Sequence, residues 1–509
     1  MKNCIGVNDD LREPSRRKLI QTGILGSVAA ALTPARASVL ERTVLTSSEA
    51  VPAFDLEEIT IVELQSKMQS GELTARSLTE KYLARIDAID RSGPTLRAVI
   101  QVNSDALRIA DELDRERKQH GLRGPLHGIP VLIKDNIGTA DNMMTTAGSL
   151  ALVGAKPPKD SFVARKLREA GAVILGKANC SEWANIRSSH SSSGWSGRGG
   201  QTKNPYALDR NPCGSSSGSG AGVSANLSVI AIGTETNGSI VCPSSINGVV
   251  GIKPTVGLWS RAGIIPISHT QDTAGPICRT VRDAATLLGA LTGVDPDDAA
   301  TIASVGKSHT DYTKFLDPNG AHGMRIGVAR SFFGFSEKVD PLMEDALNVL
   351  KKLGATIVDP ADIATRHEMG QHELLVLLYE FKTGLNAYLA RLGPDAPVHT
   401  LKEIIKFNER NREKEMPYFG QDTFLDAEKK GPLTDKEYID GLAANLKFAR
   451  TEGIDATMDK YKLDAIVAPT APPAWPTDLI NGDADSGGSS GPAAIAGYPN
   501  ITVPAGFIF

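Results

Sequence analysis

The chain has 509 residues, of which 41% are hydrophobic and 22% are charged. This composition supplies enough apolar surface for the core of one to three domains and excludes a chain that is disordered throughout. The net charge of −4 argues against binding to nucleic acid or to an anionic membrane surface, since both favour a basic protein.

The N-terminal segment, residues 1–37, has the features of an export signal. A twin arginine, Arg16 and Arg17, precedes a modestly apolar stretch over residues 19–32, and residues 35–37 (ARA) offer a cleavage site. The apolar stretch is too short and too rich in Gly, Ser and Thr for a good membrane span. We therefore expect the twin-arginine (Tat) machinery to export the protein to the periplasm, and the mature chain to have no membrane span.

The remaining chain, residues 38–509, alternates segments of helical spacing with short apolar runs after an irregular lead-in over residues 38–55. Helices are expected over residues 57–90 (broken at Gly71), 104–119, 161–171, 218–231, 281–291 and 340–353. Strands are expected over residues 98–102, 130–133, 172–177, 249–253, 324–329 and 463–468. This alternation predicts an α/β fold, with a central sheet covered by helices on both faces.

Two longer segments interrupt the alternation. Residues 187–220 are rich in Ser and Gly, which is typical either of a linker or of a functional loop. We favour a functional loop, because long loops inside compact domains commonly carry function. Residues around 330–450 are more helical and more charged, and they predict a helical excursion that covers one side of the site.

The cysteines and histidines do not predict a metal site. Four cysteines remain after the leader, and an oxidising compartment would permit three disulfide connectivities; we favour buried thiols. The chain has no CxxC spacing, and the histidines of residues 367–372 (HEMGQH) are five positions apart. That spacing differs from the HExxH pattern that binds zinc on one helix face, so neither a metal nor a cofactor is expected.

The residues that suggest chemistry are two serine-bearing loops and one lysine. The loops are residues 213–220 (CGSSSGSG) and 234–240 (TETNGSI), and Lys134 follows a predicted strand in residues 128–136 (GIPVLIKDN). A serine hydroxyl needs an adjacent base to become a good nucleophile, and a lysine can be that base only when it is neutral. Burial favours the neutral amine. Two serines and a buried lysine can therefore supply a nucleophile, a proton relay and a base for amide hydrolysis.

These segments, together with residues 251–255 (GIKPT) and 496–504 (AGYPNITVP), resemble the amidase signature family, especially its bacterial peptide amidases. The resemblance implies a central mixed β-sheet and a Ser–cis-Ser–Lys triad. In that triad Ser239 is the nucleophile, Lys134 is the base, and Ser215 is the relay, held by a cis peptide bond after Gly214. Because the family continues beyond residues 503–507 (VPAGF), the chain is expected to be truncated at its C-terminus.

The same loops supply the expected supporting groups. Backbone N–H groups near the nucleophile are candidates for the oxyanion hole, and Ser216 is expected to form hydrogen bonds near the relay. Asn237 departs from the family pattern, because many members have glycine at that position, and it adds a side chain beside the oxyanion site. The four candidate donors are Thr236, Asn237, Gly238 and Ser239.

Val241 bears on the substrate. Family members that bind a carboxylate or act on glutamine often have arginine there, so Val241 argues against such substrates. The resemblance then implies hydrolysis of the C-terminal carboxamides of peptides, with release of ammonia. The alternatives are a broad-specificity or lipid-amide hydrolase, an amidotransferase A-type subunit, and an inactive binding protein on the same fold. Three aromatic residues are candidates either for the pocket or for the core: Trp183, Trp195 and Tyr206.

A different hydrolase fold would use the same serine-rich loop. Residues 214–218 fit the G-x-S-x-G pattern of an α/β-hydrolase, with Ser216 as the nucleophile. That pattern requires a strand directly before it, and residues 209–213 (DRNPC) are a poor strand. It also requires a histidine later in the chain, for which the candidates are His269, His309, His322, His367, His372 and His399.

Overall fold

The computed structural model describes residues 51–484 and 487–508. The predicted export signal, residues 1–37, lies outside the described residues, as does most of the lead-in. Within the two described ranges, no helix is both long enough and apolar enough to cross a membrane.

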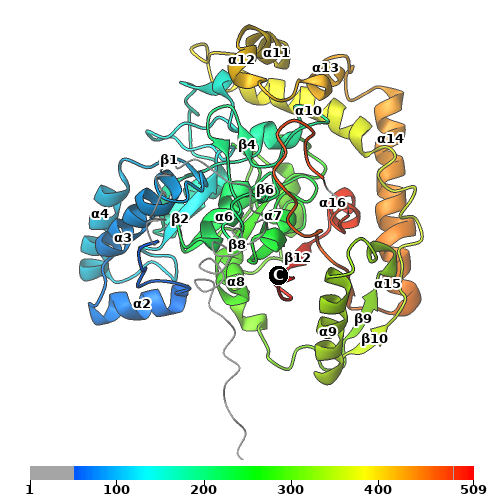
Figure 1. Cartoon of the computed structure of the whole chain (residues 1–509), viewed down its shortest axis with the longest axis horizontal. Helices are drawn as coiled ribbons and strands as arrows, with labels where there is room; N and C mark the ends of the chain where they lie inside the picture. The colour runs from blue at the N-terminus through cyan, green and yellow to red at the C-terminus, as the bar shows by residue number, and fades with distance from the viewer. Residues whose placement is uncertain (1–50, 485–486, 509) are drawn as a thin grey trace, which may run out of the picture.

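A seven-stranded mixed sheet forms the centre of the molecule (Figure 1). Strand β2 runs parallel to both of its neighbours, β3 and β6, and the other pairs are antiparallel. Every residue of β2, β3, β6 and β8 is buried, which is typical of strands covered on both faces. In spatial order the strands are β1 (Val99–Val102), β3 (Val173–Ala178), β2 (Pro130–Lys134), β6 (Ile230–Glu235), β8 (Thr273–Cys278), β7 (Val250–Lys253) and β12 (Asn500–Thr502).

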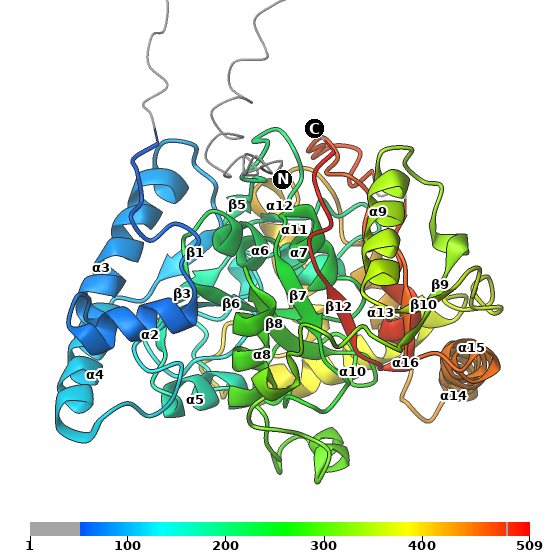
Figure 2. The same ribbon diagram turned by 90° about the horizontal axis from the view of Figure 1, so that it is seen from below.

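Helices cover this sheet, and in the view of Figure 2 helices α6 and α7 lie above its strands while α8 lies below them. The predicted break at Gly71 is confirmed, because Gly71 has a φ of 81° and caps α2 in the left-handed conformation that glycine adopts without strain. The helices of this part are α2 (Ile61–Ser70), α3 (Ala75–Arg85), α4 (Ala106–His120), α5 (Phe162–Glu169), α6 (Ser217–Ser224), α7 (Val241–Ile246) and α8 (Val281–Ala290).

The helix predicted over residues 218–231 is too long. Helix α6 ends at Ser224, and the apolar run that follows enters the sheet as β6. A short apolar run fits a buried helix and a buried strand equally well, so periodicity alone did not place this boundary. Strand β8 was not predicted, because Gly275 and Pro276 weaken its strand signal. The long loop over residues 187–220 contains a two-stranded hairpin, β4 (Trp195–Ser196) and β5 (Gly200–Gln201).

The predicted excursion is helical for the most part, but it also contributes to a second sheet. Strands β10 (Thr356–Val358), β9 (Arg325–Val328) and β11 (Ala465–Val467) form a separate parallel sheet. Residues 463–468, predicted as a core strand, therefore belong to this outer sheet, where β11 is partly exposed. The helices are α9 (Val339–Lys352), α10 (Glu373–Ala390), α11 (Leu401–Arg410), α12 (Arg412–Glu415), α13 (Asp422–Glu428), α14 (Lys436–Leu446) and α15 (Asp455–Tyr461), with a π-helical segment (Lys447–Ile454) before α15.

A buried ion cluster ties this excursion to the central part of the chain. The guanidinium of Arg187 is fully buried and donates to the carboxylate of Glu182 and to the backbone carbonyl of Glu415 in α12. Its charged group also lies 4.3 Å from the ring centre of Phe419. Because a buried charge is stable only when paired, this cluster favours a fixed position of α12 against the serine-rich loop.

Candidate active site

Lys134 lies at the C-terminal end of β2, in the middle of the parallel part of the sheet, and its side chain is fully buried. Its Nζ atom is 2.7 Å from the Oγ atom of Ser215, as expected for a base and its relay. Burial lowers the pKa of Lys134 to about 8, although the nearby Cys180, Asp272 and Glu235 oppose that shift. A substantial fraction of the amine is therefore neutral near that pH.

Thr234 completes the surroundings of this amine. Its Oγ1 atom lies 2.9 Å from Lys134 Nζ, and its backbone carbonyl oxygen lies 3.2 Å from the same atom. A neutral amine has two N–H groups and one lone pair. The two oxygen atoms of Thr234 can accept both N–H groups, which leaves the lone pair for the hydroxyl proton of Ser215. Asn136 donates to the same Thr234 hydroxyl oxygen at 3.0 Å and so fixes its position.

Ser215 lies two residues before α6, and the peptide bond between Gly214 and Ser215 is cis, as the family resemblance implied. Glycine at position 214 leaves room for Ser181, because a Cβ atom there would lie 2.2 Å from the Oγ atom of Ser181 and would displace it. The backbone carbonyl of Ser215 also accepts a hydrogen bond from the N–H group of Ser181. The loop is thus packed tightly against residues that follow β3.

Ser216 bridges the loop to β6, as expected of a supporting residue. Its hydroxyl donates to the backbone carbonyl of Thr234 at 3.0 Å and accepts from the backbone N–H of the same residue at 3.1 Å. The side chain is fully buried, and in the part of the chain that the structure describes no histidine ring forms a hydrogen bond with Ser216. Residues 209–213 do not form a strand. These observations argue against an α/β-hydrolase nucleophile at Ser216.

Ser239 lies in the turn between β6 and α7, with 9% of its surface exposed. Its carbonyl accepts a hydrogen bond from the N–H of Ser216 at 3.2 Å, which brings the two serine loops into contact. The N–H groups of Ile240 and Val241 are both occupied by the carboxylate of Glu235. By contrast, none of the four predicted oxyanion donors gives its backbone N–H to another described residue. Those N–H groups therefore remain candidates for the oxyanion hole.

Glu235 and Lys253 are buried charged residues that the sequence did not single out. Glu235 is the last residue of β6 and caps α7, while the Lys253 ammonium donates only to the backbone carbonyl of Pro254, at 3.2 Å, among the described residues. Burial lowers the pKa of Lys253 to about 8, and Glu235 opposes that shift. A carboxylate at the N-terminus of a helix is favoured by the helix dipole, so Glu235 stabilises the turn that presents Ser239.

A disulfide joins the two serine loops. Cys213 precedes the Gly214–Ser215 bond, Cys242 lies three positions after Ser239, and the two Cα atoms are 6.1 Å apart. The expectation of four buried thiols is therefore wrong for this pair and confirmed for Cys180 and Cys278. No Cys spacing could have indicated the pairing, because it depends on the contact between two loops that are distant from each other in the sequence.

We expect the Cys213→Ala/Cys242→Ala double variant to unfold at a lower temperature than the wild type. A cross-link over a loop of this size removes entropy from the unfolded chain and typically contributes about 2–4 kcal/mol. Thermal unfolding, followed by circular dichroism with and without dithiothreitol, measures the effect. Reductant should lower the midpoint of the wild type and leave the double variant unchanged. Equal midpoints for the two oxidised proteins would show that the cross-link does not stabilise the fold.

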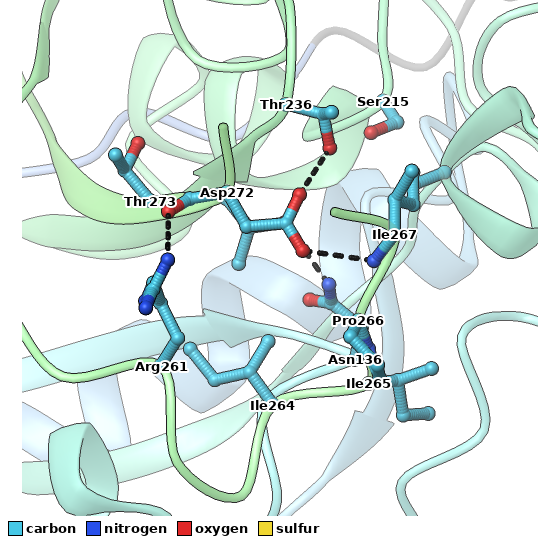
Figure 3. A pocket seen from close by; sticks show the side chains of 12 residues that line it. Asn136, Ser215, Thr236, Arg261, Ile264, Ile265, Pro266, Ile267, Asp272 and Thr273 are labelled. Atoms are coloured by element: carbon cyan, nitrogen blue, oxygen red, sulfur yellow. Dashed lines mark hydrogen bonds between the residues drawn. The ribbon is translucent and has the colours of Figure 1, made fainter. Parts of the chain in front are cut away.

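A pocket opens beside Ser215 (Figure 3). Its apolar wall consists of Ala184 and residues 264–267 (IIPI). Its two charged residues are both engaged by neighbours. Arg261 pairs with the carboxylate of Asp298 at 2.7 Å, and Asp272 accepts from the Thr236 hydroxyl at 2.6 Å and from two backbone N–H groups of residues 267 and 268. The pocket is therefore suited to a neutral, largely apolar group.

None of the three aromatic candidates lines this pocket, and two of them, Trp183 and Trp195, are buried. Both of these lie against aromatic side chains of the excursion. Tyr206 packs on Phe507. Within the described ranges, no group of three or more His, Cys, Asp or Glu side chains is placed to hold a metal ion.

Comparison with known proteins agrees with this geometry. Residues 77–508 match the amidase family. A probable amidase of Arabidopsis thaliana is 43% identical over 462 residues, which cover 89% of this chain and 85% of the plant protein. The structure of native peptide amidase from Stenotrophomonas maltophilia aligns with a TM-score of 0.85 at 50% identity, covering 89% of this chain and 91% of that one.

A second group of relatives has a different activity. The A-type component of the glutamyl-tRNA(Gln) amidotransferase from Halorhodospira halophila is 40% identical over 302 residues, which cover 59% of this chain and 60% of that protein. The fold and these matches together define a hydrolytic amidase. The chain belongs to the amidase signature family, and the predicted fold class is confirmed.

Proposed function

We propose that the protein hydrolyses the C-terminal carboxamides of peptides through an acyl-enzyme on Ser239, and that it releases ammonia. The observation that carries the proposal is the hydrogen bond between a fully buried Lys134 and Ser215, directly beside a serine turn with unoccupied N–H groups. This arrangement supports the assignment of Lys134, at the end of β2, as the base, and of the two contacting serine loops as the source of the relay, the nucleophile and the oxyanion donors.

The reaction follows from the placement of these groups. Neutral Lys134 accepts the hydroxyl proton of Ser215 as Ser215 accepts the proton of Ser239, and the Ser239 oxygen attacks the amide carbon. The N–H groups of residues 236–239 stabilise the negative charge that develops on the carbonyl oxygen. The protonated relay then donates to the leaving nitrogen, ammonia departs, and water cleaves the resulting ester by the same route in reverse.

Two observations support a peptide carboxamide as the substrate. The structural relative from Stenotrophomonas maltophilia is a peptide amidase, and half of its aligned residues are identical to those of this chain. Position 241 carries valine rather than a cation, and Arg261, the one cation among the described residues that line the pocket, is paired with Asp298. Family members that act on glutamine often have arginine where this chain has Val241, so we rank the amidotransferase alternative below peptide amide hydrolysis.

The test is a measurement of ammonia release from a panel of amides. We expect the highest kcat/KM with N-acylated dipeptide amides and lower values with simple aliphatic amides, long-chain fatty amides and glutamine. The same peptides with a free C-terminal carboxylate serve as controls and should release no ammonia. Preference for a fatty amide would support the lipid-amide alternative, and preference for glutamine would support the amidotransferase alternative. Absence of release from every amide would support the inactive binding protein.

The pH dependence of kcat/KM should report the protonation of the base. Lys134 is catalytically competent only when neutral, and its pKa is about 8 in the folded protein. The value of kcat/KM should therefore rise about tenfold per pH unit well below that pKa and level off above it. Rates between pH 6 and pH 10 (roughly two units on either side) cover the transition. A profile that is flat over this range would contradict a lysine base with a lowered pKa.

We also propose that the protein acts in the periplasm after twin-arginine export. The disulfide between Cys213 and Cys242 supports this location, since disulfides persist in oxidising compartments. Replacing Arg16 and Arg17 with lysine in the full chain should retain the protein in the cytoplasm, as measured by cell fractionation. Periplasmic recovery of this variant would argue against a twin-arginine signal.

A further inference from the structure

Asn237, the residue that departs from the family pattern, is held at both ends of its side-chain amide. Its Nδ2 atom donates to Glu373 Oε1 at 2.9 Å, and its Oδ1 atom accepts from the hydroxyl of Ser490 at 2.7 Å. Glu373 is the first residue of α10, and Ser490 immediately precedes helix α16 (Gly491–Ala496). The side chain of Asn237 therefore joins the turn of residues 236–239 (the oxyanion turn) to two segments that are far away in the sequence.

Glu373 contacts the turn by a second route. The side-chain amide of Gln271 donates to the same Oε1 atom at 2.9 Å and also to the backbone carbonyl of Thr236 at 3.3 Å. The carboxylate of Glu373 thus fixes residues 236 and 237 together. Its position at the N-terminus of an 18-residue helix favours its negative charge, while burial raises its pKa.

Helix α10 also holds the loop on the other side of the turn. The fully buried Glu380 accepts hydrogen bonds from the hydroxyl of Ser268 and from the N–H and hydroxyl groups of Thr270. This loop carries Asp272, which accepts from the hydroxyl of Thr236. Two separate hydrogen-bonded routes therefore connect α10 with the turn whose N–H groups we propose as the oxyanion donors.

We propose that Asn237 and Glu373 act as a positioning pair, which fixes the oxyanion turn against helix α10 so that its N–H groups are preorganised for the transition state. The pair acts through the backbone of the turn and does not itself contact the reacting atoms. Preorganised donors lower the barrier because they need not reorient when negative charge develops on the carbonyl oxygen. A loss of the pair should therefore lower kcat and leave KM largely unchanged.

The proposal rests on the proposed function, and it is tested with four variants of the full chain: Asn237→Ala, Glu373→Ala, Glu373→Gln and the Asn237→Ala/Glu373→Ala double variant. A displaced donor near the reacting carbonyl costs roughly 10- to 100-fold in rate. Each alanine variant should lose kcat within that range with KM within about twofold of wild type. The double variant should lose less than the combined losses of the two single variants, because both remove the Asn237–Glu373 hydrogen bond, while each also removes one contact of its own, with Ser490 or with Gln271.

Two controls separate positioning from a general loss of structure. Glu373→Gln keeps a side-chain oxygen that can accept from Asn237 and should restore most of the lost rate. Leu374→Ala changes the next residue of α10, whose side chain is 56% exposed, and should match the wild type. A peptide aldehyde, which forms a tetrahedral adduct with a serine nucleophile, should bind the alanine variants more weakly in proportion to the loss of kcat.

Three results would overturn the proposal: a higher KM at unchanged kcat, additive losses in the double variant, or unchanged aldehyde affinity. The variants are assayed with whichever amide the wild type hydrolyses. A failure of the positioning proposal can therefore be told apart from a wrong assignment of the substrate. If the wild type hydrolyses no amide, the proposed function fails, and the positioning pair fails with it.

Discussion

Replacing Ser239 with alanine is expected to lower kcat for amide hydrolysis by roughly 10⁴- to 10⁶-fold, because the variant has no oxygen to form the acyl-enzyme. The remaining groups can still bind the substrate and polarise its carbonyl, so the affinity for a competitive peptide inhibitor should change little. Ammonia release under single-turnover conditions, together with inhibitor binding by calorimetry, measures both quantities.

A matched control for this variant is Ser224→Ala. Ser224 is also a buried serine, it lies at the end of α6, and its hydroxyl has no hydrogen-bond partner among the described residues. This control should retain the kcat of the wild type. If Ser239→Ala retained the activity of the wild type while Ser216→Ala lost it, the nucleophile would be Ser216, and the assignment of the triad would be wrong.

Replacing Lys134 with methionine is expected to produce a loss of similar size, about 10⁴-fold or more. Methionine fills most of the volume of the buried side chain, but it cannot accept the proton of Ser215. Arginine should not restore activity, because its guanidinium stays protonated at every pH at which the protein is folded. The measurement is kcat across the pH range in which the wild type gains activity, and both variants should show no such gain.

The chain contains a matched control for the burial of this lysine. Lys177 in β3 is also fully buried, its pKa is likewise lowered to about 8 by burial, and it donates to the hydroxyl of Thr145 at 2.9 Å. It has no serine partner among the described residues. Lys177→Met should therefore change thermal stability without removing the pH-dependent gain in activity. Equal losses of activity in the Lys134 and Lys177 variants would attribute the effect to packing rather than to proton transfer.

The sequence predicted the strand that carries Lys134 and the two loops that carry the serines, because motif and local pattern coincide at those positions. Lys134 and Ser215 are within hydrogen-bond distance, as expected. The role of Thr234 was not predicted, although it lies within one of the quoted motifs. Thr234 contacts Lys134 because β6 lies beside β2 in the sheet. A linear pattern of residues does not specify which strands are neighbours.

Other features depend on contacts between distant segments and had no local signal. Strand β8 contains Gly275 and Pro276, which disfavour a strand in isolation, and the pairing with β6 overrides that preference. The disulfide of Cys213 with Cys242 and the link from Asn237 to Glu373 likewise require the folded arrangement of loops. The periodic helices were therefore predicted well, whereas the start of β6, the sheet to which β11 belongs and the cross-links between loops were not.

The most direct test of the central claim is to trap the nucleophile with a serine-directed fluorophosphonate and to locate the adduct by peptide mass spectrometry. The account predicts one adduct, on Ser239, that forms faster as the pH rises through about 8 and does not form in Lys134→Met. An adduct on Ser216, or labelling of Ser239 at an equal rate in the absence of Lys134, would contradict it.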